Sequence, residues 1–167
     1  MLVRRERDGD ATAIAAVTAA AFGTGEGMPV EVVLVDRLRA SEAWVPALSL
    51  VAVNDTGEVI GHVLCTRAHV DGEPALGLGP LSVHPDHQRR GVGSALMHAA
   101  VGAAEALDEP LVVLLGDPAY YSRFGFQPAA EHGIIPPVAE WTGAFQVRVL
   151  HRELRGEFAY ALPFMDL

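Results

Sequence analysis

The chain has 167 residues, half of them hydrophobic, and its 12 basic and 21 acidic residues give a net charge of −9. This length suits a single domain over residues 1–167, and the negative charge argues against nucleic acid or an anionic membrane surface as a partner. No apolar run approaches the ~20 residues of a membrane span and no signal-like segment opens the chain, so we expect a cytoplasmic protein without a membrane partner.

Two helices are predicted near the start of the chain. Asp8 or Asp10 can cap the first helix, which ends at Gly23. The second helix begins near Pro29, and its charged residues, including Glu31, can stay in water. A flexible glycine-rich loop separates the two helices.

An antiparallel meander follows the helices. Residues 49–53 and 59–67 form a hairpin, and a turn leads into a third strand at residues 75–83. Two glycines and Pro80 weaken the pairing of this third strand and favour a bulge. We expect the bulge to splay the strand away from the next one, at residues 111–115, which leaves backbone groups for an amide-bearing ligand. The alternative is an ordinary edge strand that tolerates the proline.

A helix that crosses over the sheet joins the third strand to residues 111–115. Its apolar stripe comprises Val92, Leu96, Ala99, Ala103 and Leu107. Because such a crossover returns the chain in the same direction, the two strands that it joins should be parallel.

The last third of the chain adds a short helix and further strands. Asp117 caps the helix, which ends at Gly125. A strand at residues 145–150 should point Gln146 and Arg148 outward, and residues 158–164 form the last strand.

The turn before the crossover helix carries Gln88, Gly91 and Gly93 in the pattern Q-x-x-G-x-G, with two arginines beside the glycines. Gly91 and Gly93 let the backbone approach a ligand closely and can adopt a positive φ where the turn needs it. The first amides of the following helix have no intrahelical partner. The turn therefore predicts a diphosphate site, with an ordinary strand-to-helix turn as the alternative. Its spacing fits neither a P-loop nor a dinucleotide-binding fold, and the chain contains no lysine.

This pattern resembles the acyl-CoA-binding motif of the GNAT superfamily, the Gcn5-related N-acetyltransferases. A second GNAT-like feature, Y-x-x-x-G-F, follows as Tyr121, Gly125 and Phe126. The resemblance covers most of the chain and implies an α/β fold in which helices flank a mixed, mostly antiparallel sheet of about six to seven strands, with a central parallel pair splayed at a bulge. The segment around the tyrosines also looks like a bacterial subgroup of predicted acetyltransferases.

The resemblance implies that acetyl-CoA is the co-substrate, and no metal is expected because charged hydrogen bonds from several amides can hold a diphosphate. The amides of the loop would hold the pyrophosphate, and the strand before the loop would pair with pantetheine. The residues expected to bind the cofactor are Leu81, Ser82, Val83, Gln88, Arg89, Arg90, Gly91, Val92, Gly93 and Ser94. The acetyl group would pass directly, in a ternary complex, to a primary amine of a small molecule or a peptide, and a homodimer is one assembly that the sequence allows.

Two adjacent tyrosines are candidates for the acid that protonates the leaving thiolate. Tyr121 matches the position at which many GNAT enzymes place this acid, and Tyr120 is the reserve. The alternative is that both rings simply pack the short helix against the sheet.

The general base is harder to assign. Some GNAT enzymes carry a glutamate on the strand before the loop, but the corresponding residue here is Gly77. Glu26, in the glycine-rich loop that borders the acceptor groove in the family, is the expected substitute, and the alternative is that it is a solvated loop carboxylate. Glu73, His84 and a chain of waters are the alternatives.

Other readings stay open at this point. The chain could be a CoA-binding regulatory module without turnover, or it could transfer a longer acyl chain. His84 and His87 have a metal-ligand spacing that no further ligand completes, so we expect solvated histidines. Cys65 lies in an apolar run and is expected in the core.

Overall fold

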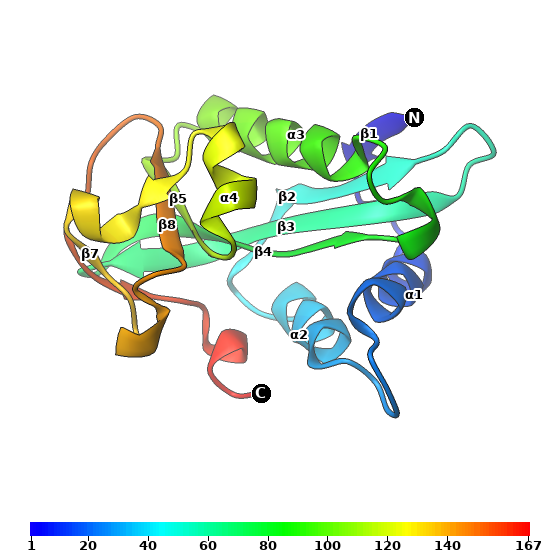
Figure 1. Cartoon of the computed structure of the whole chain (residues 1–167), viewed down its shortest axis with the longest axis horizontal. Helices are drawn as coiled ribbons and strands as arrows, with labels where there is room; N and C mark the ends of the chain where they lie inside the picture. Colours follow the sequence, from blue (N-terminus) through cyan, green and yellow to red (C-terminus); the bar gives the residue numbers. More distant parts are fainter.

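A nine-stranded mixed sheet lies between two layers of helices in a computed structural model that describes all of residues 1–167 (Figure 1). The strands are β1 Leu2–Arg5, β2 Trp44–Val53, β3 Val59–Val70, β4 Glu73–Val83, β5 Leu111–Leu115, β6 Gln127–Pro128, β7 Ile134–Ile135, β8 Phe145–Val149 and β9 Gly156–Ala159. The helices are α1 Ala11–Phe22, α2 Val30–Arg39, α3 Val92–Ala106 and α4 Pro118–Tyr121.

The strand order is β1-β2-β3-β4-β5-β8-β6, with β9 pairing with β3 and β7 off this path. Neighbouring strands on the path are antiparallel except β4 and β5, which are parallel and joined by α3. The predicted fold class and the predicted parallel pair are therefore confirmed, but the sheet has nine strands rather than six to seven, because β1 and the two-residue β7 form only through pairing with distant strands. None of the helices combines the length and the hydrophobicity that crossing a membrane requires.

Helix α3 covers one face of the sheet. Its buried side is formed by Val92, Leu96, Met97, Ala100, Val101 and Ala104. The predicted stripe is right at its start and wrong at its end, because the helix stops at Ala106 and Leu107 lies beyond it with 44% of its surface exposed.

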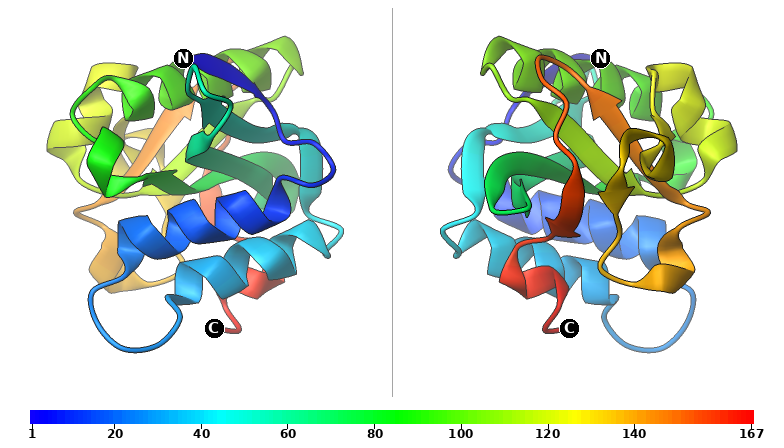
Figure 2. Two further views of the ribbon diagram at one scale, coloured as in Figure 1. Left: turned by 90° about the vertical axis from the view of Figure 1, so that its right-hand side faces the viewer. Right: turned by 90° about the vertical axis from the view of Figure 1, so that its left-hand side faces the viewer.

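Helices α1 and α2 cover the opposite face, where they pack side by side (Figure 2). Asp10 precedes α1 as predicted, but its carboxylate does not cap the helix. It accepts instead from the Arg4 guanidinium at 2.7 Å and from the Arg7 amide at 2.7 Å. The ion pair with a neighbouring strand thus replaces the expected capping bond.

The parallel pair separates part-way along its length. Pairing of β4 with β5 stops after Gly77, which lies opposite Val113. The register of β4 against β3 shifts between Leu78 and Leu81, at Gly79 and Pro80, which confirms the predicted bulge. Beyond the bulge, the edge of β4 that would face β5 has no strand partner, so its backbone groups are available to a ligand.

Two predictions in the last third of the chain are wrong. Gln146 of β8 points inward with 2% of its surface exposed, because its amide donates to the Gly116 carbonyl at 2.9 Å. The last strand ends at Ala159, and the chain continues into a 3₁₀ turn at Leu162–Phe164, where Pro163 has no amide to donate to a sheet.

His62 makes the stability of the fold depend on pH. The ring lies fully buried in β3, with Nε2 2.9 Å from the Ser49 hydroxyl. Burial, with a smaller effect from the Arg39 charge, lowers the pKa of His62 to about 3. The unfolded chain takes up this proton near pH 6.5 and the folded chain does not. Stability is therefore complete above pH 6.5 and declines as pH falls towards 3.

We expect the free energy of unfolding to fall by about 1.4 kcal/mol per pH unit between pH 6 and pH 4, measured by urea denaturation. His62→Gln should flatten this dependence, while His69→Gln, which changes an exposed ring on the same strand, should keep it. Equal stability of the unsubstituted protein at pH 7 and pH 4.5 would contradict the assignment.

Candidate active site

The loop between β4 and α3 presents a row of unpaired amides. None of the backbone N–H groups of residues 89–94 donates a hydrogen bond within the chain. Arg89 and Gly91 adopt left-handed backbone conformations, with φ of 61° and 84°, on either side of Arg90. When left-handed residues alternate with others in this way, successive N–H groups point into a common concavity that can bind an anion. The positive end of the α3 dipole strengthens the attraction for an anion.

The side chain of Gln88 ties the loop to the end of β4. Its amide donates to the Val83 carbonyl at 3.1 Å. Backbone groups alternate along a strand, so Leu81 directs its N–H and C=O to the same side as Val83, towards the gap left by β5. The Leu81 groups and the Val83 N–H therefore remain for a ligand.

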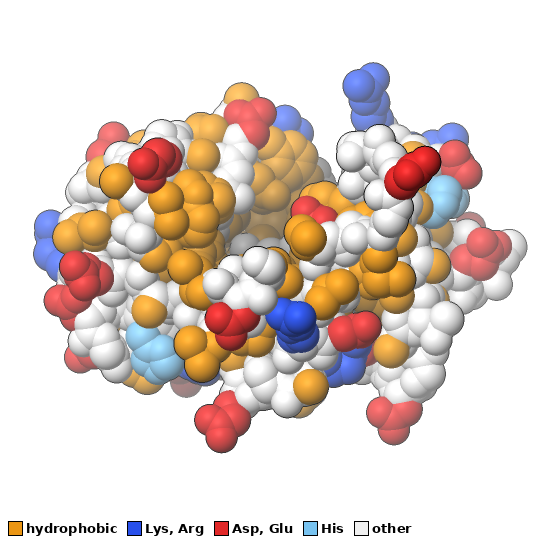
Figure 3. Space-filling view, turned by 90° about the horizontal axis from the view of Figure 1, so that it is seen from below, with side chains coloured by type: hydrophobic (Ala, Val, Ile, Leu, Met, Phe, Trp, Pro, Cys, Tyr) orange, Lys and Arg blue, Asp and Glu red, His pale blue; other side chains and the backbone are white.

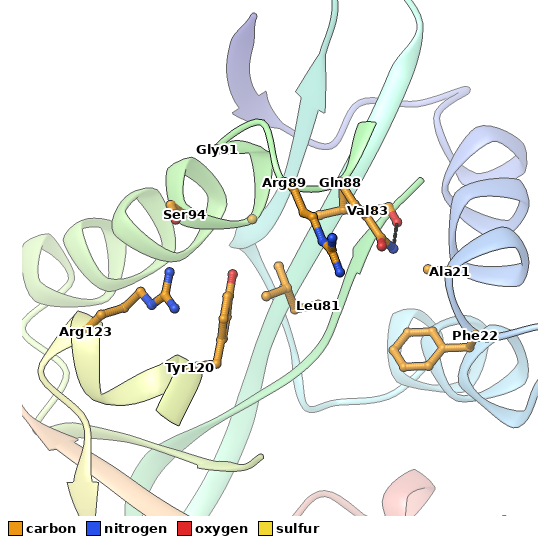
Figure 4. A pocket seen from close by; sticks show the side chains of 11 residues that line it. Ala21, Phe22, Leu81, Val83, Gln88, Arg89, Gly91, Ser94, Tyr120 and Arg123 are labelled. Atoms are coloured by element: carbon orange, nitrogen blue, oxygen red, sulfur yellow. Dashed lines mark hydrogen bonds between the residues drawn. The ribbon is translucent and has the colours of Figure 1, made fainter. Parts of the chain in front are cut away.

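A cavity of about 620 Å³ opens beside these amides (Figure 4). Its lining comprises Ala21, Phe22, Leu81, Val83, Gln88, Arg89, Gly91, Gly93, Ser94, Tyr120 and Arg123. Arg89 and Arg123 are its only charged side chains, and the Arg123 guanidinium lies 4.9 Å from the centre of the Tyr120 ring. We call this space the first cavity.

Three residues expected in the cofactor site do not line the first cavity. Ser82 is fully buried, with its hydroxyl 3.5 Å from that of Thr18. Val92 points into the core, and Arg90 is exposed to solvent. Val92 and Arg90 can therefore contribute their backbone amides, whereas the Ser82 side chain faces away from the site.

A second cavity of about 350 Å³ lies where β4 and β5 separate, and it shares Phe22 and Leu81 with the first. Its lining comprises Phe22, Glu31, Leu34, Leu78, Gly79, Pro80, Leu81, Leu114, Leu115, Tyr121, Trp141, Tyr160 and Phe164. The face that carries α1, α2 and the C-terminal turn is hollowed, and hydrophobic side chains gather on the walls of the hollow (Figure 3).

The two candidate tyrosines divide between the cavities. Tyr120 lines the first and Tyr121 the second, with their rings perpendicular and 4.8 Å apart. The Tyr120 hydroxyl lies 2.6 Å from where a Cβ at Gly93 would stand, so only glycine permits this contact. Burial raises the pKa of Tyr121 to about 12 and also raises that of Tyr120. Both phenols therefore stay protonated at neutral pH.

The structure explains why the strand glutamate is absent. A Cβ at Gly77 would stand 2.9 Å from Cε1 of Tyr160, so the ring occupies the space that an acidic side chain would need. Glu26 is exposed and lines neither cavity. Glu73 pairs with Arg152 on the surface at 3.2 Å.

The carboxylate that the structure places in the same cavity as Tyr121 is Glu31. It is half-buried rather than exposed as the sequence predicted. Helical spacing indicates which residues share a face of α2. Only the folded chain shows that Glu31 lines the same cavity as the bulge of β4.

The remaining reactive side chains take no part in either cavity. The His84 ring accepts from the Asp86 amide at 3.1 Å, and no group of three or more metal-ligating side chains occurs in the chain. Burial raises the pKa of Cys65 to about 12, which keeps its thiol protonated in the core as predicted.

Comparisons with known proteins agree with this geometry. A family model described as an acetyltransferase (GNAT) domain matches residues 46–128. The uncharacterized N-acetyltransferase YhbS of Escherichia coli K12 is 35% identical over 154 residues, which are 91% of this chain and 87% of that protein. This chain belongs to the GNAT family. It is an acetyltransferase, and the matched segment contains both the loop with the unpaired amides and the tyrosine pair.

Two crystal structures of GNAT proteins superpose over nearly the whole chain. YhbS from E. coli, in complex with CoA, has a TM-score of 0.91 at 32% identity and covers 99% of this chain and 92% of its own. A GNAT acetyltransferase from Brucella melitensis, in complex with acetyl-CoA, has a TM-score of 0.81 at 34% identity and covers 98% and 97%. The GNAT arrangement thus extends from β1 to the C-terminal turn.

Proposed function

We propose that this GNAT enzyme binds acetyl-CoA in the first cavity and transfers the acetyl group directly to a primary amine in the second. The observation that carries the proposal is the row of unpaired amides at residues 89–94, which opens into a cavity whose charged side chains, Arg89 and Arg123, are both positive. Hydrogen bonds to charged groups contribute about 1.5–3 kcal/mol each, so several amides can hold a pyrophosphate without a metal. The CoA and acetyl-CoA complexes of the two similar proteins support the same ligand.

The pantetheine arm would run along the free edge of β4. Its amides can pair with the Leu81 backbone and with the Val83 N–H, as an added strand would. This path leads from the loop to Leu81, which borders both cavities. The thioester would therefore reach the boundary at which an amine in the second cavity can meet it.

The reaction needs a neutral amine and a proton for the thiolate. The amine nitrogen attacks the thioester carbonyl carbon, the C–N bond forms, the nitrogen loses one proton to water, and the C–S bond breaks. A lysine-like amine with pKa about 10.4 costs about 4.6 kcal/mol to deprotonate at pH 7. Tyr121 donates its phenolic proton to the departing sulfur and regains one from solvent. Whichever of the Leu81 and Val83 N–H groups pantetheine leaves free would stabilise the carbonyl oxygen in the transition state.

A thiol-release assay with acetyl-CoA and a panel of amines tests this proposal. We expect CoA release that depends on the amine, an N-acetyl product detected by mass spectrometry, and intersecting double-reciprocal plots. Parallel plots and an acetylated enzyme would contradict direct transfer. CoA binding without release on any amine would contradict turnover, and faster release from longer acyl-CoA species would overturn the acetyl assignment. The homodimer and the cytoplasmic location stay predictions.

The exposed position of Glu26 leads to a prediction about the base. Because its side chain lines neither cavity, we expect Glu26→Gln to keep kcat within about threefold, with the amine proton leaving through water. The measurement is the pH profile of kcat/KM for both proteins. A fall of kcat by tenfold or more, with loss of the acidic limb of the profile, would instead assign Glu26 as the base expected from the sequence.

A further inference from the structure

The two cavities differ in the sign of their charge. Arg89 and Arg123 are the only charged side chains that line the first, whereas Glu31 is the only one that lines the second. An anionic cofactor suits the first cavity. By the same argument, the second cavity suits a ligand that carries one positive charge.

Glu31 is an unpaired carboxylate that is suited to binding a cation. It lies in the first turn of α2 and is half-buried, and its carboxylate makes no ion pair or hydrogen bond within the chain. The positive end of the helix dipole favours its ionised form. A partly desolvated carboxylate without a partner gains most from an ammonium ion that enters the same cavity.

The rest of the second cavity is apolar and rich in aromatic rings. Tyr160 lines it, with its ring centroid 4.6 Å from that of Phe164 and 6.3 Å from that of Trp141. A volume of about 350 Å³ is near the lower end of the ~300–1,000 Å³ usual for ligand sites, so the occupant is compact. A second charge on that occupant would be buried against rings without compensation.

We infer that the acceptor is a small hydrophobic amine, preferably an arylalkylamine with a single ammonium group. Glu31 pairs with the entering ammonium, while the ring of the amine packs against Trp141, Tyr160 and Phe164. The ammonium then loses one proton to water, and the resulting neutral amine attacks the thioester as described above. The inference rests on the proposed function, because it assigns the substrate class of the same site, and Glu31 acts in it as a positioning residue.

An amine panel at saturating acetyl-CoA tests the substrate class. We expect kcat/KM for 2-phenylethylamine to exceed that for ethanolamine, spermidine and a lysine-containing peptide by at least about 100-fold, because each of these lacks the apolar body or carries further polar or charged groups. A preference for spermidine or for the peptide would overturn the inference.

Substitution of Glu31 tests the ion pair. Glu31→Gln should raise KM for 2-phenylethylamine at least about tenfold, which corresponds to about 1.4 kcal/mol, and leave the Kd of CoA unchanged. Inhibition by 2-phenylethanol, which has the ring but no charge, should be the same in both proteins. Glu105→Gln, which removes one charge from the exposed side of α3, is the matched control and should behave as the unsubstituted enzyme. An unchanged KM in Glu31→Gln, or an equal loss of inhibition by the alcohol, would overturn the role of Glu31.

Two calorimetric titrations separate failure of this inference from failure of the proposed function. The first adds CoA to the protein, and the second adds 2-phenylethylamine to the CoA-bound protein. We expect saturable binding in both. Binding of CoA without binding of the amine overturns the inference and leaves the cofactor site standing, whereas absence of CoA binding refutes the proposed function itself.

Discussion

Gly91→Asp is expected to weaken acetyl-CoA binding by at least about 100-fold, or about 2.7 kcal/mol. Gly91 lines the first cavity with a φ of +84°, and a Cβ built on it meets no heavy atom within 4 Å, so a side chain has room there. A carboxylate at this point would stand against the pyrophosphate, and like charges brought together cost several kcal/mol. Calorimetric titration with acetyl-CoA measures the loss.

Gly91→Asn is the matched control for this substitution. Asparagine has nearly the size of aspartate and also tolerates a left-handed conformation, but it carries no charge. We expect it to lose less than about tenfold in affinity. Equal losses in the two variants would assign the effect to backbone strain, and unchanged binding in Gly91→Asp would remove the pyrophosphate from this loop. Circular dichroism confirms that both variants are folded.

Tyr121→Phe is expected to lower kcat by about 100-fold while the Kd of CoA stays the same, since loss of a general acid costs about 10²–10⁴-fold. The phenylalanine ring keeps the packing over Gly116 and against Phe126, and Tyr121 does not line the first cavity. With a pKa of about 12, the phenol stays protonated up to about pH 10, so the unsubstituted enzyme should show no alkaline fall in kcat from this group below that pH.

Tyr120→Phe is the natural comparison, because the two hydroxyls lie in different cavities. Tyr120 packs against Gly93 at the start of α3, so its loss should change the affinity for CoA more than kcat. If Tyr120→Phe lowers kcat and Tyr121→Phe does not, the acid is Tyr120. If neither variant is slower, the thiolate takes its proton from water.

The features that the sequence predicts well are those set by local chemistry. The left-handed glycine at position 91, the bulge at Gly79 and Pro80, and the capping of α4 by Asp117 each depend on a few adjacent residues. The parallel pairing of β4 and β5 follows from the helix that connects them, α3. These features are sufficient to place the loop and the strand edge of the proposed cofactor site.

The features that the sequence does not predict depend on residues that are far apart in the chain. Strand β1 becomes visible only through its pairing with β2. The alternation of the strand predicts that Gln146 points outward, because the sequence does not show that its amide donates to the Gly116 carbonyl. The second cavity brings together Glu31, the bulge of β4 and Tyr160 near the C-terminus. These residues are far apart in the sequence, so no local sequence pattern predicts that they meet.

The most direct test of the account compares CoA with pantetheine, which lacks the diphosphate, by calorimetric titration of the folded protein. If the amides of residues 89–94 receive the pyrophosphate, CoA and acetyl-CoA will each saturate one site, and pantetheine will bind at least about 100-fold more weakly. Absence of any heat with CoA, or pantetheine binding as tightly as CoA, would contradict the central claim.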